Sequence, residues 1–453
     1  DGSDKPMLAI DSSALGGMYA GAIRLVGTEQ GVGVKLAGDM AASAGDIQID
    51  ASGKLSLAQT AASRDIALKA QDIELGGKTY AGGKADVSAQ HQLKVKESLA
   101  AAGNVDLRGA QVVNQGVIEA GVRPDNTRAA ADLNISAQQV RNAGTLIGNR
   151  QLQVNASQAL DNQGGTLSGK ALTQIDAAQL DNRSGRLLSE QQLKVDSTHV
   201  NNASGLIQSQ GVATISASNT LDNRQGDIRS NTALTLTAGA VDNRQAGLIA
   251  SQMTLATDVA SLDNRGGGLS AKQGLTLKAG SVNTGDQGLI SSGAALTLDA
   301  GRVEAANQGE ISAKGDMSLR AGEWLQQGGQ LIGEANVSLD LKGGKLDNQG
   351  GLIAAKRQLT LGNVGQLDNR AGTLSAQQRL AVSARQVDNR DQGLIGSAGA
   401  LVLDAERLDS SNRGEVSANG ALDLQLGELL QRNGRLLGQA GVRVEVSGQL
   451  DNR

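Results

Sequence analysis

A repeat of about 21 residues is the feature that most constrains the fold of this chain. An aliphatic residue occupies every 21st position over successive repeats, at Ile290, Ile311, Ile332, Ile353, Leu374, Ile395, Val416 and Leu437. Repeats of this length are typical of solenoids, in which each repeat is a small unit that stacks on the next. The repeat therefore predicts one elongated body rather than two or three separate globular domains.

Apolar and polar residues alternate inside each repeat, as in Leu234-Thr235-Leu236-Thr237 and Leu275-Thr276-Leu277-Lys278. In a β-strand these leucines share one face, whereas in a helix residues two apart point in different directions. We expect two or three strands of about 3–6 residues in each repeat, separated by turns rich in Gly, Asn, Asp and Ser. The predicted fold class is all-β, a right-handed parallel β-helix of about 20 coils with 20–21 residues each.

The composition fits a thin core and excludes several functions. The 453 residues include no Phe and no Cys, and their aromatic residues are Trp324, Tyr19 and Tyr80. A core without aromatic area must consist of Leu, Ile, Val and Ala. The lack of cysteine excludes a disulfide scaffold and thiolate metal sites. A net charge of −4, with no basic run, argues against nucleic acid as a partner, and no apolar run reaches the ~18 residues of a membrane span.

The spacing of the repeats predicts four regions. The excess residues between Ile118 and Ile147 include Pro124 and indicate a protruding loop. The sequence does not start with Met and stops inside an Asp-Asn-Arg motif, so we expect a segment of a longer protein. The predicted regions are an irregular N-terminal segment at 1–45 with a flexible end at 1–6, irregular coils at 46–120, the loop at 121–130 and regular repeats at 131–453.

The N-terminal segment resembles a block found in bacterial filamentous haemagglutinins and in contact-dependent inhibition exoproteins of the CdiA type, in which haemagglutinin repeats follow it. This resemblance implies a secreted or surface-held protein of a Gram-negative bacterium that crosses the outer membrane through a dedicated two-partner secretion pore. Such proteins act as adhesins or carry a toxin. The residues that carry the resemblance are Ala9-Ile10-Asp11, Ala14-Leu15-Gly16-Gly17-Met18-Tyr19-Ala20-Gly21, Ile23-Arg24-Leu25, Thr28-Glu29 and Gly31-Val32-Gly33-Val34.

Repeated Asp-Asn-Arg triplets are the most prominent candidate site. One interpretation is a carbohydrate-binding or catalytic stripe; the other is a turn with stacked asparagines inside and ion pairs outside. The structural interpretation is favoured, because an active site occurs once whereas the triplets recur. The acidic members are Asp181, Asp222, Asp242, Asp263, Asp368 and Asp388, and the basic members are Arg183, Arg224, Arg244, Arg265, Arg370 and Arg390.

Other candidate residues are few. His91 and His199 have no partner at metal-ligand spacing, so we expect solvated histidines on strand faces. Gly77-Lys78-Thr79 resembles the end of a phosphate-binding loop, but Asp72 stands where that loop needs its first glycine. Trp324 replaces a small or polar residue and is expected to pack in the core. No catalytic, cofactor-binding or metal-binding residue is predicted, and the chain is not expected to be an enzyme.

Three functions remain open at this point. The favoured one is a non-catalytic stalk that holds an adhesive or toxin-bearing part away from the cell. The second is a glycan- or receptor-binding module at Gly121–Ala130 or Thr79–Gln92, and the third is a polysaccharide lyase or hydrolase. The expected partners are the secretion pore, by resemblance, and a target-cell receptor or host surface, with no small-molecule substrate. The sequence leaves the choice between adhesin and toxin carrier open.

Overall fold

The computed structural model describes residues 8–12 and 16–453. The end predicted to be flexible, at 1–6, lies outside these residues, as do Ala14 and Leu15 of the N-terminal block. The chain divides into two compact units, Asp1–Leu221 (unit 1) and Asp222–Arg453 (unit 2). Among the described residues, no helix is long and apolar enough to cross a membrane.

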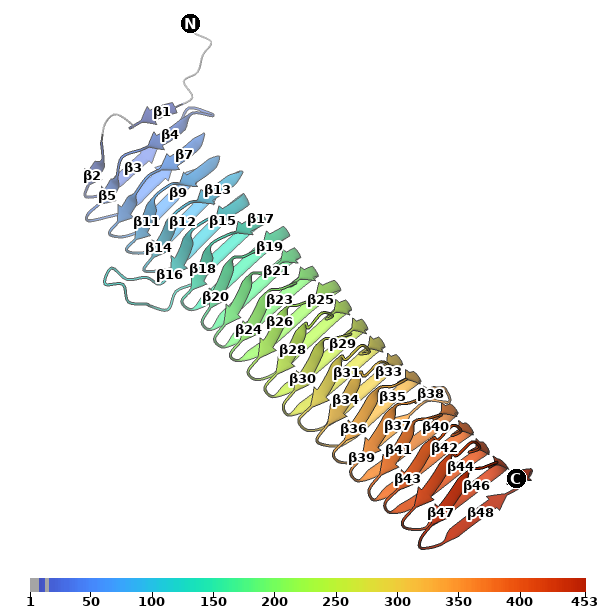
Figure 1. Ribbon diagram of the computed structural model, residues 1–453. Coiled ribbons are helices and arrows are strands. Elements are labelled where there is room, and N and C mark those ends of the chain that lie inside the picture. Colours follow the sequence, from blue (N-terminus) through green and yellow to red (C-terminus); the bar gives the residue numbers. More distant parts are fainter. Residues whose placement is uncertain (1–7, 13–15) are drawn as a thin grey trace. The chain divides into compact units, whose positions relative to one another are not determined.

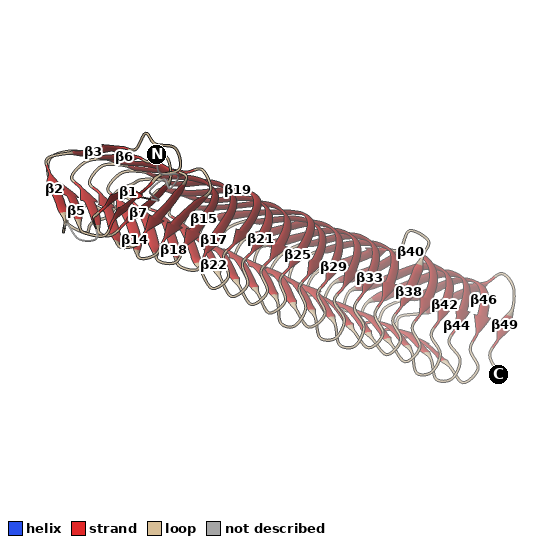
Figure 2. Cartoon of the chain, turned by 90° about the horizontal axis from the view of Figure 1, so that it is seen from above, coloured by secondary structure: helices blue, strands red, loops and turns tan. Residues whose placement is uncertain are grey.

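Both units are stacks of the same kind of turn (Figure 1). Each turn adds a short strand to one parallel stack, and a longer strand or a pair of strands to a second parallel stack. Strands make up both stacks and loops lie at their edges (Figure 2). The chain makes about 21 turns of about 21 residues, so the predicted all-β parallel β-helix is confirmed. Its right-handed sense stays a prediction.

The strands of unit 1 fall into these two stacks. The short stack contains β2 (Met18–Ala20), β5 (Met40–Ala42), β8 (Thr60–Ala62), β11 (Lys78–Ala81), β14 (Ser98–Ala101), β16 (Val117–Ala120), β18 (Thr145–Gly148), β20 (Thr166–Gly169), β22 (Arg186–Ser189) and β24 (Leu206–Ser209). The long stack contains β1 (Leu8–Asp11), β3 (Ile23–Val26), β4 (Gly33–Leu36), β6 (Ile47–Asp50), β7 (Lys54–Leu57), β9 (Ile66–Ala70), β10 (Asp72–Leu75), β12 (Ala85–Ala89), β13 (Gln92–Val95), β15 (Val105–Asn114), β17 (Leu133–Asn142), β19 (Gln151–Asp161), β21 (Leu172–Asp181), β23 (Gln192–Asn201) and β25 (Val212–Asp222), which ends at the unit boundary.

The strands of unit 2 are arranged in the same way. Its short stack contains β26 (Asp227–Ser230), β28 (Leu248–Ser251), β30 (Gly268–Ala271), β32 (Leu289–Ser292), β34 (Glu310–Ala313), β36 (Gln330–Gly333), β39 (Leu352–Ala355), β41 (Thr373–Ala376), β43 (Leu394–Ser397), β45 (Glu415–Ala418) and β47 (Arg435–Gly438). Its long stack contains β27 (Leu234–Asp242), β29 (Thr254–Asp263), β31 (Gly274–Asn283), β33 (Leu296–Glu304), β35 (Met317–Leu325), β37 (Val337–Asp340), β38 (Lys345–Asp347), β40 (Gln358–Asp368), β42 (Arg379–Asp388), β44 (Ala400–Asp409), β46 (Leu422–Leu430), β48 (Val442–Val446) and β49 (Leu450–Asp451).

Many strands of the long stack are longer than the predicted 3–6 residues. In β21, with 10 residues, two predicted strands run together. Thr173, Ile175 and Ala177 are buried in strict alternation, two exposed residues follow, and Leu180 is buried next. The alternation slips by one residue at that point, which keeps both halves of the strand facing the core. The predicted length does hold for the four-residue strands β6 and β7 of an early turn.

The inward-facing aliphatic side chains form the thin core that the composition predicts. Leu296 and Leu298 are fully buried while Thr297 between them is exposed. The column predicted from Ile290 is wrong at Ile332, because Ile311 pairs with Leu331, and Leu331 pairs with Ile353. Leu331 is fully buried, whereas Ile332 is only half-buried.

The predicted column is also wrong at its last member. Val416 pairs with Leu436, and Leu437 is 40% exposed. A strict 21-residue count fails because the spacing from Ile311 to Leu331 is 20 residues and the next spacing is 22. The longer turn interrupts its long strand between β37 and β38, where Lys342 and Gly343 have positive φ angles of 54° and 86°.

A longer connection at residues 121–132 joins β16 and β17 in unit 1 and contains the loop expected at 121–130. Its two sides meet in an antiparallel bridge between Val122 and Arg128. The Arg128 guanidinium donates to the carboxylate of Glu119, at 3.2 Å for Nη2 to Oε2, and the Tyr80 hydroxyl donates to the carbonyl of Val122 at 3.1 Å. The loop is therefore tied to the turns beneath it. The division of the chain into four regions stays a prediction.

Candidate functional site

The asparagines of the Asp-Asn-Arg triplets form a buried ladder. Each donates from its side-chain Nδ2 to the Oδ1 of the asparagine one turn further on; Asn348 to Asn369 and Asn369 to Asn389 are both 2.7 Å. The interpretation with stacked asparagines inside the turn is thereby confirmed. The buried asparagines of this column are Asn114, Asn142, Asn162, Asn182 and Asn202 in unit 1, and Asn223, Asn243, Asn264, Asn348, Asn369 and Asn389 in unit 2.

Each ladder amide also binds backbone groups. Nδ2 of Asn369 lies 3.3 Å from the carbonyl of Gly372 and 3.1 Å from the carbonyl of Leu394. Buried polar groups must be paired in this way, because an unpaired one costs about 1–3 kcal/mol. The expectation that asparagine itself adopts the left-handed conformation is wrong for this column: the positive φ of 54° belongs to Ala371, two residues later.

A glycine follows each ladder asparagine by three or four residues and was not recognised as part of the site. A Cβ on Gly372 would lie 2.1 Å from the carbonyl oxygen of Asn348 and 2.8 Å from Oδ1 of Asn369. Only glycine lets the turn approach the ladder this closely. The signal in the sequence is the recurring spacing from Asn369 to Gly372 and from Asn182 to Gly185.

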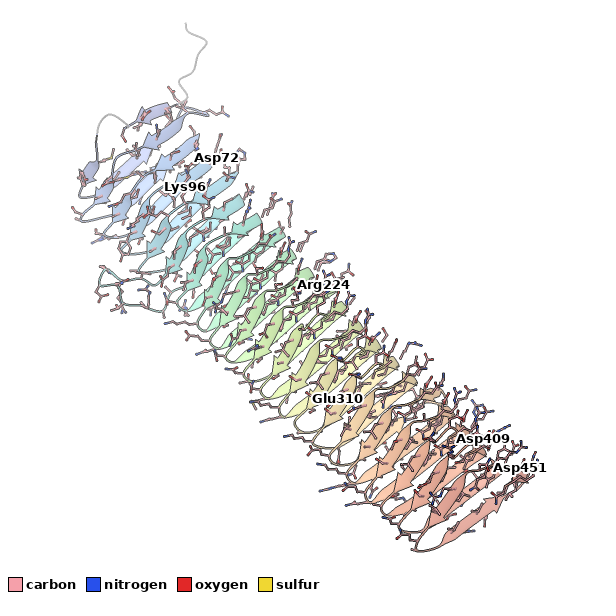
Figure 3. All side chains as sticks on the ribbon, in the orientation of Figure 1. Asp72, Lys96, Arg224, Glu310, Asp409 and Asp451 are labelled. Carbon is pink, nitrogen blue, oxygen red and sulfur yellow. The ribbon has the colours of Figure 1, made fainter. Side chains whose placement is uncertain are left out.

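The aspartates and arginines of the triplets form ion pairs outside the ladder. In unit 2, Nε and Nη2 of Arg244 lie 2.9 and 2.7 Å from the two carboxylate oxygens of Asp242. The same guanidinium is 3.6 Å from Asp263 in the next turn. Arg390 repeats this geometry with its own Asp388 and with Asp409. Figure 3 shows Arg224 and Asp409 along one edge of unit 2.

These contacts hold the aspartates in the ionised form. Burial raises the pKa of Asp242, but the hydrogen bonds and charge of Arg244 outweigh burial, so that its pKa lies below the ordinary 3.8. For Asp263 the side-chain hydrogen bond from Arg265 is the largest effect, and its pKa is likewise lowered. The pKa of Arg244 is raised, chiefly by its hydrogen bond to Asp242.

The arrangement is suited to stabilising turns rather than to chemistry. A general acid needs a carboxyl group with a raised pKa, and the pKa values of Asp242 and Asp263 are shifted the other way. The guanidinium groups that could bind a ligand are already paired with carboxylates of their own and neighbouring turns. The geometry supports the structural interpretation of the triplets over the catalytic or carbohydrate-binding stripe.

The ladder changes character in the middle of unit 2. Asn264 donates to the hydroxyl of Thr284 at 3.1 Å, the next turn has Ala305 at this position, and the turn after that has Gln326. Gln326 accepts a 2.9 Å hydrogen bond from Nε1 of Trp324 and donates to Oδ1 of Asn348 at 3.3 Å. The sequence does not predict this substitution of the ladder.

Trp324 is fully buried, which confirms its expected place in the core. Its register partners are Val303 in the preceding turn and Leu346 in the following one. The expectation that tryptophan replaces a small or polar residue is therefore wrong, since the column is aliphatic. The indole finds its hydrogen-bond partner inside the core, as a buried tryptophan requires.

The remaining candidates lie apart from one another. His91 is exposed, with Nδ1 3.9 Å from a carboxylate oxygen of Asp72, and Nδ1 of half-buried His199 lies 2.9 Å from the Thr220 hydroxyl. Thr79 of the Gly-Lys-Thr sequence is buried in β11. Within residues 8–12 and 16–453, no group of three His, Cys, Asp or Glu side chains could hold a metal ion.

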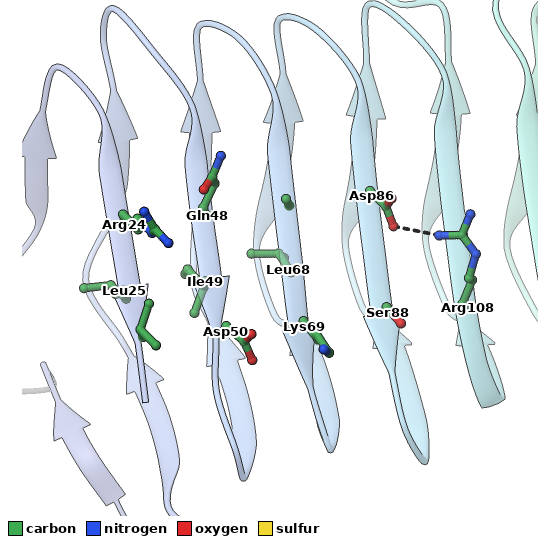
Figure 4. Close-up of a pocket in the computed structure, with 12 residues that line it drawn as sticks. Arg24, Leu25, Gln48, Ile49, Asp50, Leu68, Lys69, Asp86, Ser88 and Arg108 are labelled. Atoms are coloured by element: carbon green, nitrogen blue, oxygen red, sulfur yellow. Dashed lines mark hydrogen bonds and ion pairs between the residues drawn. The ribbon is translucent and has the colours of Figure 1, made fainter. Parts of the chain in front are cut away.

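A cavity of about 500 Å³ lies on the long stack of unit 1, a place that the sequence does not indicate (Figure 4). It crosses β3, β6, β9, β12 and β15, and its charged lining residues are Arg24, Asp50, Lys69, Asp86 and Arg108. Arg108 donates to Asp86 at 2.9 Å. Residues that meet here come from turns of unequal length, so the repeat gives no signal for it.

Comparison with known proteins gives several partial matches to large toxins. The chain is 39% identical over 171 residues to the 16S rRNA endonuclease CdiA of Enterobacter cloacae, which covers 37% of the chain and 5% of that protein. It is 41% identical over 101 residues to the tRNA nuclease CdiA of Yersinia mollaretii, which covers 22% of the chain and 3% of that protein. It is 48% identical over 85 residues to the toxin CdiA of Yersinia pestis, 18% of the chain and 3% of that protein.

The chain thus spans no more than about a twentieth of the length of these relatives. No solved structure matches it. The profile of the haemagglutinin repeat matches residues 8–59, 60–138, 128–225, 223–317, 294–350, 335–425 and 406–453. These matches follow the stacked turns and their ladder through both units, and the chain belongs to the haemagglutinin repeat family.

Proposed function

We propose that the chain is a non-catalytic stalk segment of a large exoprotein, secreted by or held on the surface of a Gram-negative bacterium. The observation that carries this proposal is the repetition of one self-sufficient turn. Each turn directs its ladder amide to the next turn, as Asn348 does to Asn369 and Asn369 to Asn389. A turn built to bind its own neighbours provides length, and length is what a stalk supplies.

The partners follow from the family. The relatives that match this chain include a protein named as a toxin and others named as nucleases, all of them far longer than the chain. A stalk in such a protein would hold an adhesive or toxin-bearing part at a distance from the cell and would leave through an outer-membrane two-partner secretion pore. The lack of cysteine suits passage of an unfolded chain, since a disulfide formed in the periplasm would obstruct the pore.

The contact at the far end would be a target-cell receptor or a host surface, and not nucleic acid or a small-molecule substrate bound by this segment. A second candidate function is that the segment itself binds a glycan or receptor. The loop at 121–130 favours it, because the contact of Arg128 with Glu119 fixes the loop while Pro124, Asp125 and Asn126 stay exposed.

Removal of whole turns from the exoprotein that carries this segment tests the stalk. Deleting residues 265–389 joins Asn264 to Arg390, which are adjacent in the repeat, and removes six turns that are aligned in register from Asp263 to Asp388. At about 4.8 Å for each turn, unit 2 becomes shorter by about 29 Å. The control deletes residues 122–129 and leaves the turns intact.

A stalk predicts that the shortened protein is still secreted and folded, and that attachment to or delivery into target cells falls as more whole turns are removed. It also predicts that the loop deletion has no effect in the same cell-contact assay. Loss of attachment in the loop deletion, with the six-turn deletion fully active, would instead support the binding module.

A further inference from the structure

Five successive turns of unit 2 carry charges of alternating sign at one outward position of the long stack. The five side chains are aligned in register, each with the next, from β29 to β37 (Figure 1). Thr237 precedes them and Gly362 follows them at the same position, so the series has two uncharged ends. We call it the charged strip; its members are Asp258, Lys278, Asp299, Arg320 and Asp340.

The charged strip lies on an open, even face. The side chains of Asp258 and Lys278 are 61% and 71% exposed, and Arg320 is also exposed. Beside the strip, two residues earlier in each strand, runs an aligned column of exposed short hydroxyl side chains that leaves no bulky group above the sheet. This column consists of Thr276, Thr297, Ser318, Ser338 and Thr360.

Neighbours along the strip neutralise one another within the molecule. Nζ of Lys278 lies 3.5 Å from Asp258, and Lys342 reaches across two turns to Asp299 at 2.9 Å. With Lys342 included, the face carries three negative and three positive charges. A face that is neutral in sum but alternates in sign repels no second face of the same kind, provided that the two are offset correctly.

We propose that two copies of this chain pair face to face through their charged strips, with the stacks antiparallel. A two-fold axis along the strand direction, between Lys278 and Asp299, brings each strip onto its own copy with every sign reversed. Lys278 then faces the partner copy's Asp299, and Asp258 faces its Arg320. Because the axis is two-fold, each of these ion pairs forms twice. The pairing goes beyond the stalk role, which a single copy can fulfil.

The register is set by exposure. A two-fold axis one turn further on, between Asp299 and Arg320, would also match opposite charges, but it would leave Asp258 opposite Gly362. The proposed axis pairs both Asp258 and Lys278, whose side chains are largely exposed. The contact covers few turns and is polar, so the association is weak and depends on salt.

Complementary charge reversals test the pairing on the full 453-residue chain. Asp258→Lys alone would place lysine opposite Arg320, and Arg320→Glu alone would place glutamate opposite Asp258. Each variant should weaken self-association at least tenfold in sedimentation equilibrium, measured from ~10 μM to ~1 mM, the range expected for a weak contact. An equimolar mixture of the two variants should restore association, because each new charge then meets its opposite.

The mixture separates pairing between molecules from effects within one molecule, since mixing cannot repair a disturbed strip inside either chain. Lys314→Glu, an exposed change on the corner after β34, is the matched control and should associate like the unaltered chain. Circular dichroism verifies that all variants are folded. A monomeric unaltered chain at ~1 mM in low salt, a mixture that stays monomeric, or an equal loss in Lys314→Glu would each overturn the proposal.

Discussion

A single asparagine in each turn does most of the polar work in the core of this solenoid. Asn369 illustrates this: its Nδ2 contacts Asn389, Gly372 and Leu394, and its Oδ1 accepts from Asn348. The amide suits the column because it has a donor and an acceptor at opposite ends, so identical residues can pair without limit. A carboxylate of the same shape has no donor to offer.

Asn369→Asp should therefore destabilise unit 2 by about 3 kcal/mol or more, because it buries a charge and leaves the carbonyls of Gly372 and Leu394 without their donor. Hydrogen exchange followed by mass spectrometry should show faster exchange in the turns around Asn348 and Asn389. The control is Asn419→Asp, at an exposed turn position, which should cost less than about 0.5 kcal/mol. Equal exchange in the two variants would contradict the role of the ladder.

The alternation of inward and outward side chains was predictable for most strands, and its failures have identifiable causes. Leucines two apart, such as Leu296 and Leu298, share the core face as expected. The strict 21-residue count fails at Ile332 because a 20-residue turn is followed by one of 22. A shift of one residue moves a side chain to the other face of a strand, so a small error in spacing becomes a complete error in burial.

Leu331 and Ile332 provide a direct test of this register. Leu331→Asp should destabilise the turn by at least about 3 kcal/mol, since it places a charge in the core, whereas Ile332→Asp should cost less than about 1 kcal/mol. The two variants differ by one position and carry the same new side chain, so each is the control of the other. Limited proteolysis around β36 should cut the first variant much faster, and the reverse order would refute the pairing of Leu331 with Ile311.

The candidate site was predictable in part. The repeat of Asp-Asn-Arg indicated a ladder with ion pairs outside, because identical residues at identical positions must stack. The gap at Ala305 was not predictable, since what closes it is Trp324 and Gln326 one turn later, a compensation in three dimensions. The cavity beside Arg24 and Asp86 was missed because the early turns lack a common length.

Across the whole chain, stability is expected to depend on many small charge contacts rather than on one site. The pKa values of Asp181, Asp242, Asp263 and Asp368 lie below the ordinary 3.8, and each of these aspartates pairs with the arginine two residues later. Each half-exposed pair contributes about 0.2–1 kcal/mol. Because the pKa is lowered in the folded state, this contribution is fully present above pH 3.8 and is lost as the pH falls through the folded values.

We therefore expect the urea midpoint of unfolding, followed by circular dichroism, to be nearly constant from about pH 7 to 5 and to fall below about pH 4. A chain with Arg183, Arg244, Arg265 and Arg370 changed to Gln should show a smaller fall, because its aspartates no longer have lowered pKa values. A main loss of stability between pH 7 and 6 would show that other groups control the acid response.

The ladder has a consequence for the gene as well as for the protein. Any two ladder asparagines in a regular stretch occupy equivalent positions, as Asn264, Asn369 and Asn389 do. Unequal recombination between the DNA segments that encode two such turns adds or removes complete turns, and every new junction joins a chain end to the start that it already fits. Copies of the gene that differ in length by whole repeats should then all encode folded proteins, so the reach of the stalk can change by inheritance in steps of one turn.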